Sequence, residues 1–288
     1  MLRERLITGA FLIAGLLALA WLDSLLPIWH SQWGRVGPGV VLAFTVVVVL
    51  APLMAREMAA LTRGGSAVLH WLAIVGGSLV LFLPHSAEQC FTVYPRALAG
   101  VVALGMLAAL LHARTRVADG AARAIAGPLA SLALVGVPLG FWLLLRREHE
   151  AWTLAGAILC VKVSDIGAYF TGSAIGRTKL IPWLSPGKTW EGFVGGLAAS
   201  TLFGCGLAFL SQQPFAADQF VETVSIERGA IIGACLGLVG VAGDLIESML
   251  KRDAGVKDSG ATIPGMGGLY DVLDSLLFAG PVAWLLLT

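Results

Sequence analysis

Acidic and basic side chains are concentrated in one short stretch of an otherwise apolar chain, residues 243–258. On a helix, Asp244, Glu247 or Ser248, and Lys251 would share one face, because they recur every three to four residues. The acids lie deeper in the apolar stretch than the lysine does. Carboxylates in such a position are candidates for binding a metal cation.

A second acidic pair follows a glycine-rich turn at residues 264–268. Asp271 and Asp274 are one helical turn apart, so their carboxylates face the same way. The short connection predicts that the two helices are antiparallel neighbours, with Asp244 close to the pair. Three carboxylates in a low-dielectric site need a compensating cation, and oxygen ligands favour Mg²⁺. We therefore predict a Mg²⁺ site formed by Asp244, Asp271 and Asp274, at which a second cation is an open alternative.

A purely structural explanation is that these acids form ion pairs with Lys251, Arg252 or Lys257 and only fix helix packing. Ionisable residues inside a membrane are energetically expensive and usually functional. Three acids, three bases and a glycine turn in so short a stretch favour a functional site. Further upstream, Lys162 and Asp165 are three residues apart, and they either neutralise each other across one turn or take part in catalysis.

The segment before residue 191 combines hydroxyl groups with a lysine: Ser185, Lys188 and Thr189. Its Gly-Lys-Thr end suggests a P-loop, but Pro182 stands where that motif has its first glycine, and the neighbouring segments are apolar spans rather than a strand. Hydroxyls, amides at a helix start and the Lys188 ammonium still suit a phosphate. The alternative is an interfacial loop whose Lys188 extends to lipid headgroups.

Long apolar runs must position these residues. The chain is 57% hydrophobic and 13% charged, with a mean hydropathy of +0.84, whereas a soluble domain is about half apolar and about a quarter charged. The runs are long enough to cross a ~30 Å hydrocarbon core as helices and lack the alternation of barrel strands. We predict an all-α, polytopic transmembrane helical bundle of about nine spans, at residues 6–22, 39–55, 67–83, 97–112, 124–145, 152–174, 191–211, 229–250 and 270–287.

The distribution of positive charge predicts the orientation of these spans. With alternating loops, one side collects thirteen Lys and Arg residues and the other five, while Lys162 lies within a span. Because cytoplasmic loops retain positive charge, the N-terminus is predicted to be cytoplasmic and the C-terminus external. The larger set is Arg3, Arg5, Arg56, Arg63, Arg114, Arg116, Arg123, Arg177, Lys179, Lys188, Lys251, Arg252 and Lys257, and the smaller is Arg35, Arg96, Arg146, Arg147 and Arg228.

The two halves of the chain differ in polarity. Residues 1–150 form spans with almost no ionisable side chain, and we expect them to be a scaffold that faces lipid and offers possible oligomer contacts. Residues 151–288 hold the acids and lysines, so we expect the catalytic region and its cytoplasmic loops there. Small residues in the spans permit a homodimer. A net charge of +1 and the lack of a basic stripe interleaved with aromatics argue against a nucleic acid partner.

The polar segments together resemble the phosphatidate cytidylyltransferases, or CDP-diacylglycerol synthases. The resemblance covers roughly residues 160–275, and two positions depart from the commoner pattern: Met266 stands in place of His and Val272 in place of Arg. The segments 165–169 and 185–192 also look like motifs of this family. The matching signature consists of Ser248, Lys251, Arg252, Lys257, Asp258, Ile263, Pro264, Gly267, Gly268, Asp271 and Asp274.

The resemblance implies a multi-pass enzyme of the cell membrane that acts in phospholipid biosynthesis. Its substrates would be CTP and phosphatidate, and it would use Mg²⁺ in an active site on the cytoplasmic side. Asp244, Asp271 and Asp274 would hold the metal, and Lys251 and Lys257 would complete the catalytic set. The implied substrate-binding residues are Ser185, Lys188, Thr189, Ser248, Arg252, Asp258, Gly267 and Gly268.

Two other functions fit parts of the pattern. A cation-coupled transporter would use the acids to bind a carried ion, but it predicts acids in mid-span on several helices and no phosphate-binding loop. A nucleotidyltransferase acting on another membrane lipid, such as a prenyl or ether lipid, would have the same polar residues, because contacts with lipid chains are generically apolar.

Overall fold

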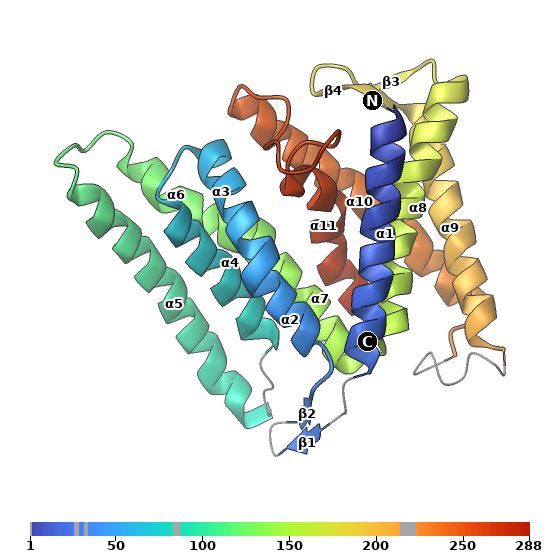
Figure 1. Ribbon diagram of the computed structural model, residues 1–288, viewed down its shortest axis with the longest axis horizontal. Helices are drawn as coiled ribbons and strands as arrows, with labels where there is room; N and C mark the ends of the chain where they lie inside the picture. Colours follow the sequence, from blue (N-terminus) through green and yellow to red (C-terminus); the bar gives the residue numbers. More distant parts are fainter. Residues whose placement is uncertain (1, 26–28, 32–33, 83–86, 214–222) are drawn as a thin grey trace.

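The computed structural model describes residues 2–25, 29–31, 34–82, 87–213 and 223–288, with side chains for residues 8–25, 37–82, 98–213 and 223–288. Helices dominate these residues (Figure 1). They are α1 (Leu2–Ser24), α2 (Val40–Thr45), η1 (Val46–Leu50), α3 (Ala51–Thr62), α4 (Ala67–Phe82), α5 (Ala87–Ala113), α6 (Ala121–Ser131), η2 (Leu132–Gly136), α7 (Val137–Glu148), α8 (Ala151–Ile175), α9 (Trp190–Ser211), α10 (Ile226–Asp253) and α11 (Leu269–Leu287).

Strands are confined to two short antiparallel hairpins in the described residues. The first pairs β1 (Trp29–Ser31) with β2 (Gly34–Val36), and the second pairs β3 (Lys179–Ile181) with β4 (Ser185–Thr189). The fold is therefore all-α, as predicted.

Six helices are long and apolar enough to cross a membrane, counted over the described part of the chain. They cover Val40–Thr62, Ala121–Glu148, Ala151–Ile175, Trp190–Ser211, Ile226–Asp253 and Leu269–Leu287. Shorter apolar helices at Thr8–Ser24, Ala67–Phe82 and Leu98–Ala113 coincide with the other three predicted spans. The chain is thus a polytopic membrane protein, while the count of nine spans stays a prediction.

Two of the long helices contain a π-helical turn before a proline. η1 precedes Pro52 and η2 precedes Pro138, and the helix continues through both. A proline ring clashes with the carbonyl four residues earlier and lacks an N–H, and a π turn accommodates that loss. The prolines therefore distort these spans without ending them.

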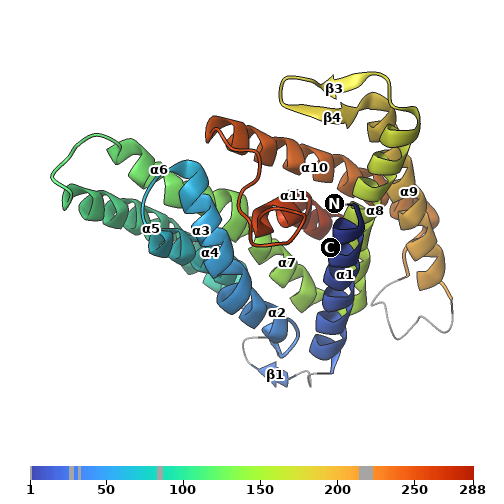
Figure 2. The ribbon, with the colours of Figure 1, turned by 45° about the horizontal axis from the view of Figure 1, so that its top comes forward.

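Connections that the sequence analysis assigns to the Lys- and Arg-rich side of the membrane lie at one end of the bundle. The end at the top of Figure 1, called here the upper end, carries the turns after α3 and α5, the β3–β4 hairpin and the connection from α10 to α11. Figure 2 shows this hairpin and connection from above. Arg3, Arg5, Arg35 and Arg96 were counted in predicting which side is cytoplasmic, and their side chains lie outside the described residues.

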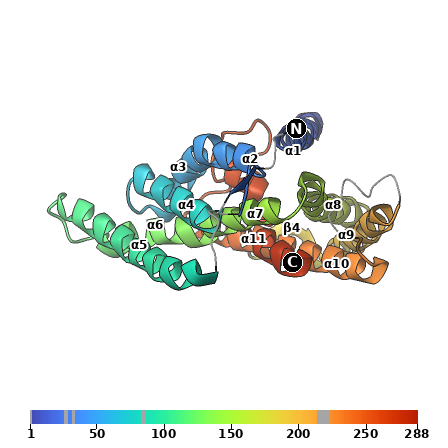
Figure 3. The same ribbon diagram turned by 90° about the horizontal axis from the view of Figure 1, so that it is seen from below.

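α11 packs against two groups of helices. Seen from below in Figure 3, the bundle is much wider than it is deep. Tyr270 and Leu277 belong to a core cluster with Met54, Met58 and Ile74 of the preceding helices. Further along α11, the residues Ala279 and Ala283 belong to a second cluster with α7, α8 and α10. The helix that carries the predicted acids is therefore fixed from two sides.

Small residues bring α9 and α10 into backbone contact. A Cβ at Gly233 of α10 would overlap the carbonyl oxygen of Ser200 on α9, so only glycine permits this approach. Close packing of α9 holds the end of the β3–β4 hairpin beside α10.

A buried ion pair joins three helices at the lower end. Arg146 Nε of α7 lies 2.6 Å from Asp23 Oδ2 of α1, and both side chains are almost fully buried. The Asp23 carboxylate also accepts hydrogen bonds from the backbone N–H groups of Gly39, at 3.1 and 3.0 Å, and Val41, at 3.2 Å. It thereby caps the start of α2 from a different helix.

Candidate active site

Three carboxylates meet between α10 and α11 near the upper end. One oxygen each from Asp244, Glu247 and Asp274 can be chosen so that all lie within 4.8 Å of one another. Glu247 is fully buried and Asp274 is 9% exposed, whereas about a third of the Asp244 side chain is open to solvent. Asp244 and Asp274 of the two antiparallel helices therefore lie close together, and Asp244 is the acid that is accessible from outside.

The sequence assigns Asp271 to this cluster, but the structure places Glu247 beside Asp244 and Asp274. Asp271 Oδ1 lies 2.7 Å from Lys251 Nζ, while Oδ2 accepts from the N–H of Ser259 at 2.8 Å, its hydroxyl at 2.8 Å and the N–H of Gly268 at 2.7 Å. Asp271 therefore caps its own helix and binds a lysine. Its role as a metal ligand stays a prediction.

Lysines compensate the acids on both sides of the cluster. Lys251 lies one helical turn beyond Glu247, with its Nζ 2.5 Å from Glu247 Oε2 and 2.7 Å from Asp271 Oδ1. Lys188, at the end of the hairpin, reaches Asp244 Oδ2 at 2.7 Å. The Ser248 hydroxyl donates to Asp244 Oδ1 at 3.4 Å. Two cations from different elements thus face three clustered carboxylates.

The cluster suits a divalent cation. Among the described residues, Glu247 Oε1 is buried without a hydrogen-bond partner, which is costly for a carboxylate unless a cation is supplied. With a metal–oxygen distance of ~2.1 Å, adjacent oxygens around Mg²⁺ are about 3.0 Å apart and opposite ones about 4.2 Å. The three oxygens lie within 4.8 Å of one another, so their side chains would close inward on a bound ion.

The β3–β4 hairpin places the predicted phosphate loop beside α10. Thr189 is the N-cap of α9, where its hydroxyl oxygen accepts from the N–H of Gly192 at 3.1 Å. Ser185 pairs with Ile181 across the hairpin. Arg252 Nε donates to the carbonyl of Leu184 at 3.4 Å, which ties the hairpin to the end of α10. Lys188 and the start of α9 therefore border the carboxylates.

The remaining predicted residues lie on the connection from α10 to α11. Lys257 and Asp258 are exposed there. Gly267 has a φ of 98°, and a Cβ at this position would lie 2.6 Å from Asp271 Oδ2. Gly268 is the N-cap of α11. The two glycines let the connection close tightly against the Asp271 carboxylate.

Two features of the site were not assigned to it from the sequence. Glu247 shares the predicted helical face with Asp244, but Ser248 fits the same spacing, so the choice between them needed the structure. Lys162 and Asp165 form an ion pair at 3.2 Å. Lys162 also contacts α11, because its Nζ lies 2.8 Å from the Ser275 hydroxyl. Since Ser275 follows Asp274 directly, this network borders the carboxylates.

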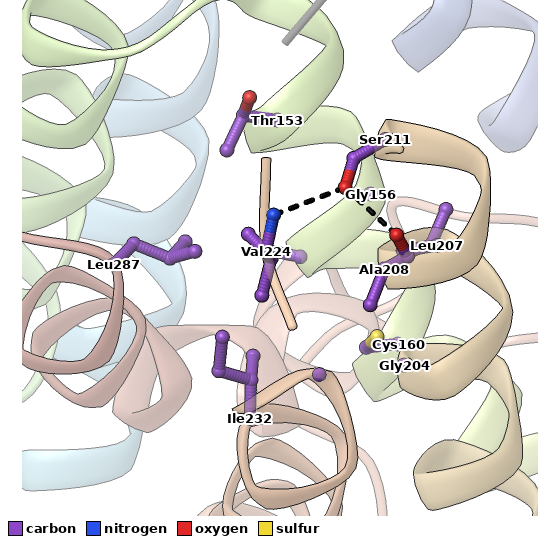
Figure 4. A pocket seen from close by; sticks show the side chains of 12 residues that line it. Thr153, Gly156, Cys160, Gly204, Leu207, Ala208, Ser211, Val224, Ile232 and Leu287 are labelled. Carbon is purple, nitrogen blue, oxygen red and sulfur yellow. Dashed lines mark hydrogen bonds between the residues drawn. The ribbon is translucent and has the colours of Figure 1, made fainter. Parts of the chain in front are cut away.

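A separate pocket lies at the other end of these helices (Figure 4). It is lined mainly by apolar and small residues of α8, α9 and α10, among them Gly156, Cys160 and Ile232. Ser211 is engaged there, since its hydroxyl donates to Ala208 and accepts from the N–H of Val224. Nothing in this lining suits a phosphate, so the candidate site is the carboxylate cluster.

Several curated phosphatidate cytidylyltransferases are similar to part of this chain. The protein of Synechocystis sp. is 44% identical over 128 residues, which are 44% of this chain and 40% of the relative. The Haemophilus influenzae protein is 42% identical over 133 residues, 46% of this chain and 44% of the relative. The Staphylococcus aureus protein is 40% identical over 159 residues, 55% of this chain and 57% of the relative. In each case the match spans less than two thirds of the relative's own length.

The family assignment has a wider basis than these partial alignments. Residues 4–288 match the model of the cytidylyltransferase family. This match includes α10, α11, the hairpin and the preceding helices. The chain therefore belongs to the cytidylyltransferase family.

Proposed function

We propose that this protein is a phosphatidate cytidylyltransferase, which converts CTP and phosphatidate to CDP-diacylglycerol and pyrophosphate in phospholipid biosynthesis. The observation that carries the proposal is the cluster of Asp244, Glu247 and Asp274 next to Lys188 and Lys251, in a chain of the cytidylyltransferase family. The relatives named phosphatidate cytidylyltransferase support it.

The proposed reaction is a transfer of a cytidylyl group. A phosphate oxygen of phosphatidate forms a bond to the α-phosphorus of CTP, and the bond from that phosphorus to the oxygen bridging to the β-phosphorus breaks. The electron pair of the broken bond leaves with pyrophosphate, and nothing is oxidised or reduced. Since the attacking oxygen is already anionic at neutral pH, positioning and charge neutralisation supply most of the catalysis.

Each group of residues has a role in this proposal. Asp244, Glu247 and Asp274 would hold Mg²⁺, and Asp271 is retained from the sequence as a further candidate ligand. When bound, Mg²⁺ would neutralise negative charge on the triphosphate. Lys188 and Lys251 would contact phosphate oxygens, because each already lies at the edge of the cluster. The outer binding set is Ser185, Thr189, Ser248, Arg252, Lys257, Asp258, Gly267 and Gly268.

The proposed site faces the cytoplasm of a cell-membrane enzyme with nine spans. The upper end carries connections whose Lys and Arg residues belong to the larger set, among them Arg114, Lys188 and Lys257, which favours a cytoplasmic position by the positive-inside rule. CTP is available on that side, and phosphatidate presents its phosphate at headgroup depth. A homodimer and a second cation at the site belong to the same proposal.

A direct assay tests the proposal. The purified protein in lipid vesicles is given CTP and Mg²⁺ with phosphatidate, or with a prenyl phosphate as the competing acceptor, and the products are identified by mass spectrometry. We expect CDP-diacylglycerol and pyrophosphate in equal amounts from phosphatidate only. Turnover of the prenyl phosphate alone would assign another lipid substrate. A folded protein that modifies neither lipid but carries a cation flux across the vesicles would be a transporter, and the proposal would be wrong.

A further inference from the structure

A glutamate of the amino-terminal half is bonded to the connection that holds the candidate site. Glu57 of α3 is 5% exposed, and its carboxylate accepts four hydrogen bonds from the segment 259–270. The donors are the Ser259 hydroxyl at 3.1 Å, whose one proton is shared with Asp271, the Thr262 hydroxyl at 2.8 Å, the N–H of Leu269 at 2.8 Å and the N–H of Tyr270 at 2.7 Å. All of these contacts cross more than 200 residues of sequence.

Glu57 satisfies N–H groups at the start of α11 that neither the glycine N-cap nor Asp271 reaches. The first N–H groups of a helix lack partners within it, and the N-cap residue here is glycine. Asp271 accepts from Gly268, and Glu57 takes the next two N–H groups. A carboxylate at a helix N-terminus is also favoured by the helix dipole.

Two glycines of the connection make room for this carboxylate. A Cβ at Gly260 would lie 3.0 Å from Glu57 Oε1, and a Cβ at Gly268 would lie 2.7 Å from the same oxygen. A side chain at Gly268 would overlap the Glu57 carboxylate and the Ser259 hydroxyl, and one at Gly260 would press against the carboxylate. The connection is therefore shaped around an acid that comes from another part of the chain.

α3 also contacts the other end of the connection. Arg63, the C-cap residue of α3, donates from its guanidinium to the carbonyl of Ala254 at 2.5 Å. Ala254 is in turn the C-cap of α10. The Arg63 cation thus lies at the carboxyl end of α10, and the Glu57 anion lies at the amino end of α11. Helix dipoles favour both placements.

From Glu57, a continuous series of contacts leads to the buried carboxylate of the site. The Ser259 hydroxyl lies between Glu57 Oε2, at 3.1 Å, and Asp271 Oδ2, at 2.8 Å. Asp271 Oδ1 is paired with Lys251, which is paired with Glu247. Movement of the first turn of α11 would therefore displace Asp271 and Lys251 and, one turn further on, Asp274.

We propose that Glu57 is a positioning residue of the active site, which holds the connection and the first turn of α11 so that the carboxylates of α10 and α11 share one cation. The part of this inference that concerns turnover rests on the proposed function. The part that concerns the position of α11 stands on the contacts alone.

Hydrogen exchange tests the structural part without any substrate. Glu57→Gln keeps the size of the side chain but turns an amide toward N–H donors, and Glu227→Gln alters an exposed acid at the far end of α10 as the matched control. We expect exchange in the segment 259–270 to rise about tenfold in Glu57→Gln, with α9 unchanged, because a helix cap and a buried acceptor are lost. Exchange equal to that of the control would overturn the proposal.

The dependence of turnover on Mg²⁺ tests the positioning part. In Glu57→Gln we expect the Mg²⁺ concentration for half-maximal rate to rise about tenfold, as for other residues that orient metal ligands. Glu57→Asp, which keeps the charge but shortens the reach, should fall between this variant and the wild type. A lower rate with an unchanged Mg²⁺ dependence would reduce Glu57 to a folding role. If the wild type itself makes no CDP-diacylglycerol, the proposed function fails, and the exchange experiment still decides whether Glu57 holds α11.

Discussion

Two groups of buried charges lie at opposite ends of this bundle, and they differ in how completely their atoms are satisfied. At the lower end, both oxygens of Asp23 are used, by Arg146 and by two backbone N–H groups at the start of α2. At the upper end, Asp244, Glu247 and Asp274 bring three carboxylates together, and Glu247 Oε1 has no hydrogen-bond partner among the described residues.

The difference distinguishes charged residues that stabilise helix packing from charged residues that can bind a ligand. A buried acid with a full set of donors fixes the packing of its helices and has no capacity for a further ligand. A buried cluster of acids with too few donors is unstable by itself, and it gains stability when a cation enters. We therefore expect substitutions at the upper end to change turnover, and those at the lower end to change stability.

The largest loss of turnover is expected from Glu247→Gln. The substitution keeps the shape of the fully buried side chain but removes a charged oxygen from the cluster and the partner of Lys251. We expect the rate per folded molecule to fall by about a thousandfold, the scale of losing one strong electrostatic contact in an active site. The measurement is CDP-diacylglycerol formation at saturating Mg²⁺, with Glu227→Gln on the same helix as control. A decrease of less than about tenfold would place the metal elsewhere.

A smaller loss is expected from Lys251→Met. Methionine keeps the apolar length of the side chain, but Glu247 and Asp271 lose their shared cation, and the phosphate contact proposed for Lys251 is removed. We expect the rate to fall by about a hundredfold. Steady-state kinetics with varied CTP would show this loss mainly in kcat/KM. Wild-type kinetics would mean that Lys251 serves packing alone.

Lys188→Ala should have a modest effect, because its ammonium pairs with a single carboxylate of the site, that of the partly exposed Asp244. We expect a loss of about tenfold in kcat/KM, consistent with one phosphate contact at the edge of the site. Lys179→Ala, at an exposed position on the partner strand β3, is the matched control. Equal behaviour of the two variants would favour the interpretation of Lys188 as an interfacial anchor.

Asp23→Asn should leave turnover within about twofold of the wild type and lower the stability instead. Removing one partner of a buried ion pair leaves the Arg146 guanidinium without its counter-charge, which costs about 3–5 kcal/mol. Thermal unfolding of the protein in detergent, read beside the rate per folded molecule, checks both statements. A large loss of turnover without a loss of stability would remove the distinction between the two ends.

The helices and part of the site could be predicted from the sequence. Apolar runs report directly on burial in lipid, and each predicted span coincides with a helix of the described residues. Asp244 and Asp274 were expected to meet, because a short connection makes consecutive helices neighbours. The choice of Glu247 over Asp271 depends on how the connection folds, since Asp271 caps α11 and also accepts hydrogen bonds from Ser259 of the connection.

Glu57 could not be assigned to the site from the sequence, for two physical reasons. The charged pair Arg56 and Glu57 interrupts the apolar run, so the predicted span ends at residue 55, whereas α3 continues to Thr62. Donors from residues 259–270 satisfy the Glu57 carboxylate within this part of the helix. Contacts between residues so far apart in the sequence follow from tertiary packing and leave no local pattern.

The most direct test compares one acid from each end of the bundle in a single preparation series. Wild type, Asp274→Asn and Asp23→Asn are assayed for CDP-diacylglycerol formation, and Mn²⁺ binding to the same samples is measured by electron paramagnetic resonance in the absence of substrate. We expect Asp274→Asn to remain folded and to lose both metal binding and turnover, while Asp23→Asn keeps both. If folded Asp274→Asn binds Mn²⁺ and turns over like the wild type, the carboxylate cluster is not the catalytic centre.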